Sequence, residues 1–173
     1  MTKTRGLANT MSKDINMDNR MDQNAFQEEA MKLSNQLCFP LYAAARTVTG
    51  LYTPYLKPLG LTYTQYIVML VLWEKDGVSV SEIGERLMLD NGTLSPLLKK
   101  LEKLGYIERS RCREDDRVVE ISLTKEGKAL KEKAKEIPFQ VAGCFDMPEG
   151  KAAQLYELLY ELLESRGYKK GGK

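Results

Sequence analysis

The amino-acid sequence predicts a mainly α-helical fold with a small β-hairpin. Two observations carry this prediction. From Val80 to Leu104, apolar residues recur at the three- and four-residue spacing of helices, whereas from Tyr106 to Leu123 apolar and polar residues alternate as in strands. The chain has 173 residues, enough for one domain with a proper core and short for two.

The amino-terminal part predicts a tail followed by a long helix. Residues 1–25 are polar, rich in Met and Asn and without periodicity, which indicates a mobile tail. We expect a helix from near Asn35 to about Leu56. Its regular part should begin around Cys38, because Pro40 is tolerated only near the start of a helix.

Three helices are expected next. Residues 63–75 are apolar on most faces, which predicts a buried helix, and Ser79 to Glu82 fit a capping box that opens a short helix. The segment TLSPLLKKLEKLG then predicts a third helix that Gly105 ends, with Pro96 expected in the first turn. Its leucines form one stripe.

The remaining chain predicts a hairpin and two further helices. Strands are expected over 106–109 and 119–123, joined by the charged loop SRCREDDR. A helix should run from about Lys125 to Ile137 and end at Pro138, and a last helix from about Glu149 to Ser165, with a leucine-rich apolar face.

A basic surface accompanies the third helix and the hairpin. Residues 99–113 contain six basic and two acidic residues in a chain whose net charge is only +2. Short helix, turn, second helix and basic hairpin follow the order of a winged helix-turn-helix, which binds DNA. The second helix is expected to approach the bases and phosphates of DNA, and the tip of the hairpin is expected to enter a minor groove. The predicted DNA-binding residues are Asn91, Thr93, Ser95, Lys99, Lys100, Lys103, Arg113 and Arg117.

The amino-acid composition argues against several other classes of protein and site. There is no histidine, so Ser-His-Asp and Cys-His catalysis are excluded, and no cofactor or metal site is expected. The three widely spaced cysteines, Cys38, Cys112 and Cys144, form no disulfide framework and fit a reducing cytoplasm. The sequence contains no run of eighteen apolar residues, so no membrane-spanning helix is expected.

The residues around Cys38 raise the question of thiol chemistry. A sulfur at a helix start is favoured as a thiolate by the helix dipole, whereas the neighbouring Leu37, Phe39 and Leu41 favour the neutral thiol. Tyr42, four residues on, lies on the same helix face. Tyr52 is fourteen residues away, roughly 21 Å along an unbroken helix, so it can approach only the Cys38 of a second chain unless the helix bends back.

The quoted residues resemble a known family. LDNGTLSPLLKKLEKLGYIERSRCREDDRVVEISLT is similar to the winged-helix core of MarR-type transcription regulators, and LSNQLCFPLY with LTYTQY resembles the OhrR branch of organic-hydroperoxide sensors. The resemblance implies a homodimeric repressor that binds a palindromic operator, senses organic hydroperoxides through Cys38 and is not an enzyme. It also implies hydrogen bonds to Cys38 from Tyr42 and from Tyr52 and Tyr63 of the partner subunit.

Two points stay open within this resemblance. Some members of the branch carry a resolving cysteine after the winged domain, and Cys144 lies in that region, so one-cysteine and two-cysteine mechanisms are both open. A MarR-type regulator released by a small phenolic or acidic ligand, without thiol chemistry, is the main alternative. A thiol peroxidase or reductase is a further one, although no CxxC motif is present.

The expected organisation has five parts. It consists of a mobile tail (1–25), a dimerisation helix with the sensing cysteine (26–60), a winged helix-turn-helix (61–124), carboxy-terminal dimerisation helices (125–166) and a short tail (167–173).

Overall fold

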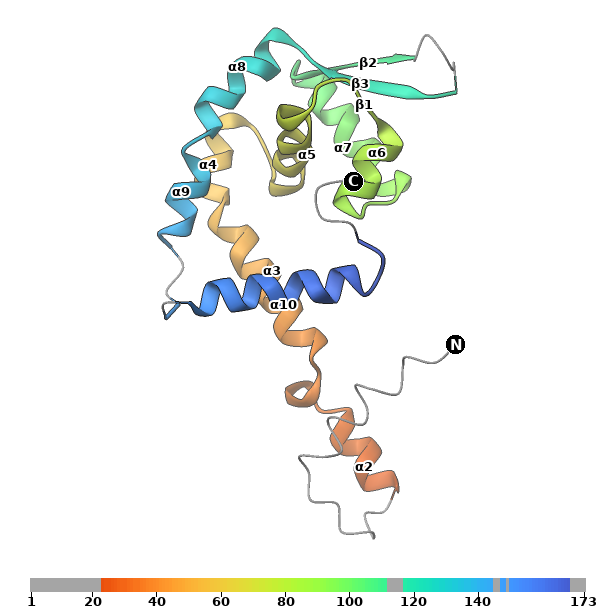
Figure 1. Cartoon of the computed structure of the whole chain (residues 1–173), viewed down its shortest axis with the longest axis vertical. Helices are drawn as coiled ribbons and strands as arrows, with labels where there is room; N and C mark the ends of the chain where they lie inside the picture. Colours follow the sequence, from red (N-terminus) through yellow and green to blue (C-terminus); the bar gives the residue numbers. More distant parts are fainter. Residues whose placement is uncertain (1–22, 112–116, 145–146, 149, 169–173) are drawn as a thin grey trace. The chain divides into compact units, whose positions relative to one another are not determined.

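The computed structural model describes residues 23–111, 117–144, 147–148 and 150–168 (Figure 1). The chain divides into two compact units at the bond between Thr47 and Val48. In the first unit, a short helix and a 3₁₀ turn precede a helix that begins at Cys38, as predicted, and that continues into the second unit as far as Leu51. These elements are α2 (Gln23–Ala30), η1 (Leu33–Asn35) and α3 (Cys38–Leu51). Residues 1–22 of the predicted tail lie outside the described residues, and its last three residues belong to α2.

The long helix predicted to reach Leu56 is interrupted. It ends at Leu51, and a short helix, α4 (Thr53–Leu56), and a 3₁₀ turn, η2 (Lys57–Leu59), follow. Pro54 explains the break, because proline has no N–H to donate to the carbonyl four residues before it and its ring crowds that carbonyl. Gly60 then takes a left-handed conformation (φ 70°) and turns the chain toward the next helix.

The second unit is built around α5 (Tyr63–Glu74). Thr62 and Gln65 form a complete capping box at its start, and six of its twelve residues are buried. The elements that follow it are β1 (Val78–Ser79), α6 (Val80–Leu87), α7 (Asn91–Lys103), β2 (Ile107–Arg111), β3 (Val119–Leu123), α8 (Lys125–Ala134), α9 (Ile137–Ala142) and α10 (Lys151–Glu164). Figure 1 shows α5 with α8 on one side and α6 and α7 on the other.

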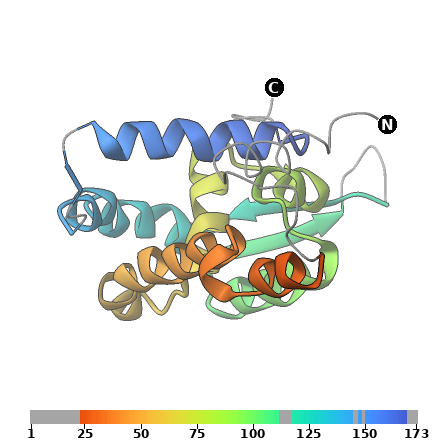
Figure 2. The same ribbon diagram turned by 90° about the horizontal axis from the view of Figure 1, so that it is seen from below.

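The predicted hairpin is part of a three-stranded antiparallel sheet of order β1-β3-β2. Strands β2 and β3 pair from Ile107 with Leu123 to Arg111 with Val119, and Figure 2 shows the two arrows side by side. The two-residue strand β1 adds the third edge by pairing Val78 with Ile121. The sequence gives little sign of β1, since two residues carry no alternation to detect.

Two helices are predicted after the hairpin, and the described residues there form three, α8, α9 and α10. Helix α8 ends at Ala134, and Pro138 lies in the first turn of α9 rather than ending a helix. A proline is tolerated in a first turn because the amides there have no intrahelical acceptor. No described helix has the length and apolarity needed to span a membrane.

A single hydrophobic core holds the second unit together. It joins α4, α5, the two helices α6 and α7, the sheet, α8 and α9, through side chains that include Tyr66, Met69, Leu98 and Ile121. Helix α10 contributes no buried residue.

Candidate nucleic-acid interface and thiol site

The turn between α6 and α7 is fixed by two caps and one unusual backbone conformation. Ser79 accepts a hydrogen bond from the Glu82 amide at 3.1 Å and so opens α6, whereas the Glu82 carboxylate pairs with Lys75 instead of completing a capping box. Met88 ends α6 in the left-handed region (φ 53°). Asp90 then caps α7 by accepting from the Thr93 amide at 2.8 Å. These caps set the direction in which α7 leaves the turn.

Helix α7 buries its leucines and exposes its basic side. Leu94, Leu98 and Leu101 are fully buried, as the predicted stripe requires. The predicted DNA-binding residues of this helix are exposed except for Ser95, which is half-buried; they are Asn91, Thr93, Lys99, Lys100 and Lys103. The opposite side of the helix from its core contacts is therefore basic.

Two features of α7 differ from the expectation. Pro96 lies in the second turn rather than the first, because the helix already begins at Asn91. The residue four positions earlier is Gly92, whose exposed carbonyl loses its helical donor. In addition, the Thr93 hydroxyl donates to the Asp90 carboxylate at 2.9 Å, so its hydrogen is already used in capping. Thr93 can therefore meet a base only through its oxygen or its methyl group.

The hairpin of β2 and β3 forms the wing, and the structure describes its strands but not the loop of residues 112–116 at its tip. Arg111 ends β2, Arg117 precedes β3, and both are exposed. Arg113 and Cys112 lie outside the described residues.

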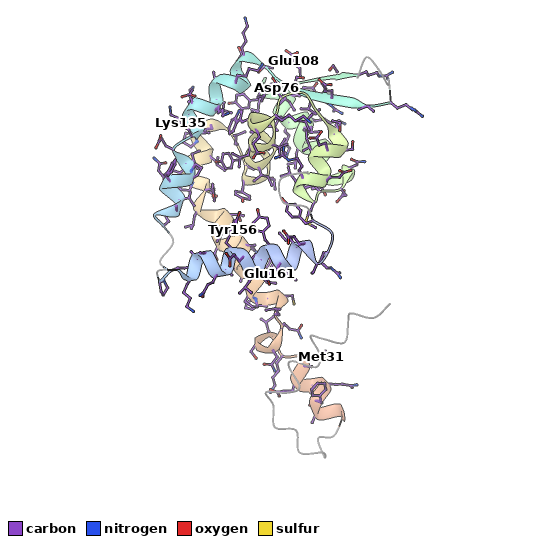
Figure 3. The ribbon with its side chains drawn as sticks, viewed as in Figure 1. Met31, Asp76, Glu108, Lys135, Tyr156 and Glu161 are labelled. Carbon is purple, nitrogen blue, oxygen red and sulfur yellow. The ribbon has the colours of Figure 1, made fainter. Side chains whose placement is uncertain are left out.

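Asp76 fixes the base of the wing. One carboxylate oxygen accepts from the amides of Leu123 (2.8 Å) and Gly77 (3.0 Å), and the other pairs with Lys128 at 2.9 Å. Burial alone raises the pKa of Asp76, but these hydrogen bonds outweigh it and the pKa is lowered. Figure 3 shows Asp76 at the end of α5, beside the sheet. The wing is thus tied to α5 and α8.

Cys38 is an exposed free thiol in the first turn of α3. Its sulfur donates to the Gln36 side-chain oxygen at 3.8 Å, and the Gln36 amide group in turn donates to the Ala30 carbonyl. Tyr42, one turn further on, accepts a hydrogen bond from Arg46 at 2.9 Å. Among the contacts of the described residues, Cys38 therefore meets Gln36, and Tyr42 meets Arg46.

The other two predicted tyrosines lie together in the second unit. The rings of Tyr52 and Tyr63 are in edge contact, with centroids 4.9 Å apart, and Tyr66 lies 5.8 Å from Tyr52. Burial raises the pKa of Tyr52, and burial together with Tyr52 raises the pKa of Tyr63. Both phenols therefore keep their protons at neutral pH and can donate hydrogen bonds.

Cys144 follows α9 and is exposed. Its sulfur donates to the Gln140 carbonyl at 3.4 Å. The nearby Cys144 side chain raises the pKa of Tyr55. Because the Tyr55 amide also donates to the Tyr52 carbonyl (3.1 Å), Cys144 lies close to the segment that carries Tyr52.

Sequence reasoning missed Gln36, Arg46 and Tyr55 as neighbours of these groups. Of these, Arg46 could have been predicted, because it lies four residues after Tyr42 and therefore on the same face of the helix. The contact between Tyr55 and Cys144 joins residues far apart in the chain, and one sequence gives no sign of it.

Comparisons with known proteins bear on both the basic helix α7 and the Cys38 thiol. Residues 50–134 match the model of the transcriptional regulator SarA/Rot family. Over 149 residues the chain is 46% identical to the organic hydroperoxide resistance transcriptional regulator of Bacillus subtilis, an alignment that covers 86% of this chain and 97% of that protein.

Solved structures of the regulator AbfR are also similar. The structure of reduced AbfR bound to DNA superimposes with a TM-score of 0.66 and 36% identity, covering 81% of this chain and 97% of that one. The structure of disulfide-formed AbfR gives a TM-score of 0.58 and 35% identity, covering 83% and 98%. AbfR comes from Staphylococcus epidermidis.

Proposed function

Because the chain belongs to the organic hydroperoxide regulators of the MarR family, we propose that it is a DNA-binding repressor that releases its operator when Cys38 is oxidised. The observation that carries this proposal is the combination of an exposed basic helix, α7, with an exposed free thiol at the start of α3. The first feature suits phosphate and base contacts, and the second suits attack on a peroxide.

The thiol step is a two-electron oxidation. The Cys38 thiolate attacks the outer oxygen of an organic hydroperoxide, so that an S–O bond forms and the O–O bond breaks. Sulfur is oxidised to sulfenic acid, the peroxide is reduced, and the departing alkoxide takes a proton to become an alcohol. The apolar neighbours of Cys38, including the 42% exposed Phe39, favour hydroperoxides with an organic group over hydrogen peroxide.

The proposal places Tyr52 and Tyr63 of the partner subunit at this thiol, with Tyr42 from the same helix. Two observations support it. Tyr52 and Tyr63 already contact each other and hold their protons, so they form a ready pair of donors. Helix α3 is unbroken from Cys38 to Leu51, so an antiparallel crossing of two such helices brings the start of one to the end of the other.

A homodimer is supported by uncovered apolar surface. Leu155, Leu158, Leu159 and Leu162 of α10 are between 36% and 62% exposed, although they form the apolar face of one helix. A contiguous exposed face of this kind marks an interaction surface. A second copy of the chain is the occupant we propose, because a two-fold dimer presents two α7 helices to the half-sites of a palindromic operator, spaced by about one turn of DNA or 34 Å.

The signal reaches DNA because the tyrosines and α7 share one core. Tyr106, at the start of the wing, donates to the Leu59 carbonyl at 3.0 Å, and Trp73 of α5 donates to the Gly127 carbonyl at 2.9 Å. Tyr52 and Tyr63 pack against the same core as α7. A change at the tyrosines is therefore transmitted to α7 as a movement of the whole winged helix, which alters the spacing of the two recognition helices.

Cys144 is the resolving thiol we propose. Two observations support this role: Cys144 is exposed, and it lies near Tyr55, in the unit that carries Tyr52 and Tyr63. If the partner's sulfenic acid forms beside those tyrosines, Cys144 attacks its sulfur, an S–S bond forms and water leaves. Mass spectrometry of oxidised protein without reductant tests this, since it distinguishes a Cys38–Cys144 disulfide from a mixed disulfide with a small thiol.

The central experiment compares wild type with Cys38→Ser in a DNA gel-shift assay. Both reduced proteins should bind, and cumene hydroperoxide should release wild type only. Cys144→Ser keeps the sensor and removes the proposed resolving thiol, so its Cys38 should still be oxidised but should form no Cys38–Cys144 disulfide. Equal release of wild type and Cys38→Ser would refute thiol sensing and favour a regulator controlled by a small ligand.

A further inference from the structure

Helix α3 contains a single charged residue, Arg46, in the segment CFPLYAAARTVTGL. Cys38, Tyr42 and Arg46 are spaced by four residues each, so the three side chains follow one another along the same face of the helix. At 1.5 Å per residue, Arg46 lies about 12 Å from Cys38 along the axis. That separation exceeds the distance over which exposed charges interact strongly in physiological salt, roughly 8 Å.

The structure links Arg46 to Tyr42 in two ways. An Arg46 guanidinium nitrogen donates to the Tyr42 hydroxyl oxygen at 2.9 Å, and the guanidinium carbon lies 5.6 Å from the centre of the Tyr42 ring. The first interaction is a hydrogen bond from a cation, and the second is a cation–π contact. Together they hold a ring that is otherwise 58% exposed.

These contacts determine what the Tyr42 hydroxyl can do. Its oxygen accepts from Arg46, so its single hydrogen must go to a different partner, and accepting a bond from a cation makes a hydroxyl a stronger donor. Long side chains on a helix lean toward its amino end, which for Tyr42 is the turn that holds Cys38. The Cys38 thiol at present gives its own proton to Gln36, a bond that an ionised sulfur cannot make. A thiolate there needs a donor.

We propose that Arg46 is a positioning residue of the peroxide sensor, which presents the hydroxyl hydrogen of Tyr42 to the ionised sulfur of Cys38. This inference rests on the proposed function and adds to it a residue that acts through Tyr42. Arg46 does not touch the reacting atoms. It stabilises the reactive anion by fixing and polarising the donor, and the thiolate then attacks the hydroperoxide as described above.

The test measures how fast cumene hydroperoxide converts Cys38 to sulfenic acid in the full-length reduced protein. Dimedone traps the product, and mass spectrometry of the Cys38 peptide quantifies it. Wild type is compared with Arg46→Met, Tyr42→Phe and the double variant, from pH 5 to pH 9. Lys133→Met, an exposed lysine of α8, is the control for loss of one positive charge.

We expect Arg46→Met and Tyr42→Phe each to slow the reaction about two- to tenfold, the effect of one hydrogen bond. The double variant should be no slower than Tyr42→Phe alone. The curve of rate against pH should move to higher pH in Arg46→Met, and Lys133→Met should match wild type. Arg46→Lys, which keeps the charge and a donor but not the planar group, should fall between wild type and Arg46→Met.

Several outcomes would overturn the inference. If Arg46→Met slows the reaction as much in the Tyr42→Phe background as in wild type, Arg46 acts by charge alone. If Arg46→Met reacts at the wild-type rate, it has no role in sensing. If wild-type Cys38 yields neither trapped sulfenic acid nor a disulfide, the proposed function itself fails, and this inference fails with it.

Discussion

Replacing Lys99, Lys100 and Lys103 with glutamine should sharply reduce the salt dependence of DNA binding. All three are exposed on the side of α7 opposite its buried leucines. A dimer presents six such lysines, and each phosphate that is neutralised contributes about 0.9 to the slope of log affinity against log salt. Six contacts therefore account for a slope of about 5, or roughly a thousandfold fall in affinity over a fourfold rise in salt. The variant should lose most of this dependence.

Fluorescence anisotropy measures the effect, with a labelled duplex selected by the reduced wild-type protein from a random library and titrated at several KCl concentrations. The control replaces Lys125, Lys133 and Lys151 with glutamine, which removes the same charge from exposed positions outside α7. Its slope should stay within about one of the wild-type slope. A control slope reduced as much as that of the α7 variant would show that overall charge, and not α7, governs binding.

Three further predictions concern the scaffold that positions α7 and the wing. Gly127→Ala should lower the melting temperature by about 5–10 °C, because its added carbon would lie 2.0 Å from the Tyr106 carbonyl oxygen; an unchanged melting temperature in calorimetry would contradict this packing. Asp76→Ala should cost about 1 kcal/mol in urea unfolding at pH 7 after allowance for the 38% exposure of Asp76. Because the pKa of Asp76 is lowered on folding, its contribution is present above about pH 4 and is lost as the pH falls through the folded value, so the difference in stability between wild type and variant should shrink as the pH is lowered below about 4. Pro96→Ala should stabilise the protein by about 2 kcal/mol, since it returns a donor to the Gly92 carbonyl, and a loss of stability would show that the proline is needed for the path of α7.

The helices and the wing could be predicted because local signals and the final fold agree. The leucine stripe of α7 and the alternation of β2 and β3 each report burial on one face, and the structure buries those faces. The positions of the prolines relative to the helices are predicted less well. Pro40 lies near a helix start as expected, but Pro96 lies in the interior of α7 and Pro138 begins a helix instead of ending one. A proline restricts the backbone without fixing which side of it is helical, so the outcome depends on tertiary packing.

The candidate site could be predicted only as far as contacts are local in sequence. The basic residues of α7 lie in a strongly patterned segment, so their exposure follows from the helix that carries them. For Cys38 the sequence predicts a position at a helix start, through Pro40, but not its exposure. The edge contact of Tyr52 with Tyr63 and the proximity of Tyr55 to Cys144 depend on how the segment around α4 packs against α5 and α9. Packing of this kind is a property of the whole core, and no spacing in the sequence encodes it directly.

The exposed thiol and the uncovered leucines of α10 have a common physical consequence. A cysteine open to solvent meets small peroxides as readily as large ones, so selectivity for organic hydroperoxides requires apolar surface around the sulfur. In one chain Cys38 is exposed, and within the described part of the structure its thiol donates to Gln36. The dimer we propose would add to the apolar surface that Phe39 begins and would supply hydrogen-bond donors, because association that covers the α10 leucines would also bring the Tyr52–Tyr63 pair of one subunit to the thiol of the other. Sensing is then a property of the interface. In this proposal, oxidation of Cys38 changes the same contacts that hold the two α7 helices at the spacing of the operator, and a reaction at one sulfur atom thereby alters the affinity of the whole dimer for DNA.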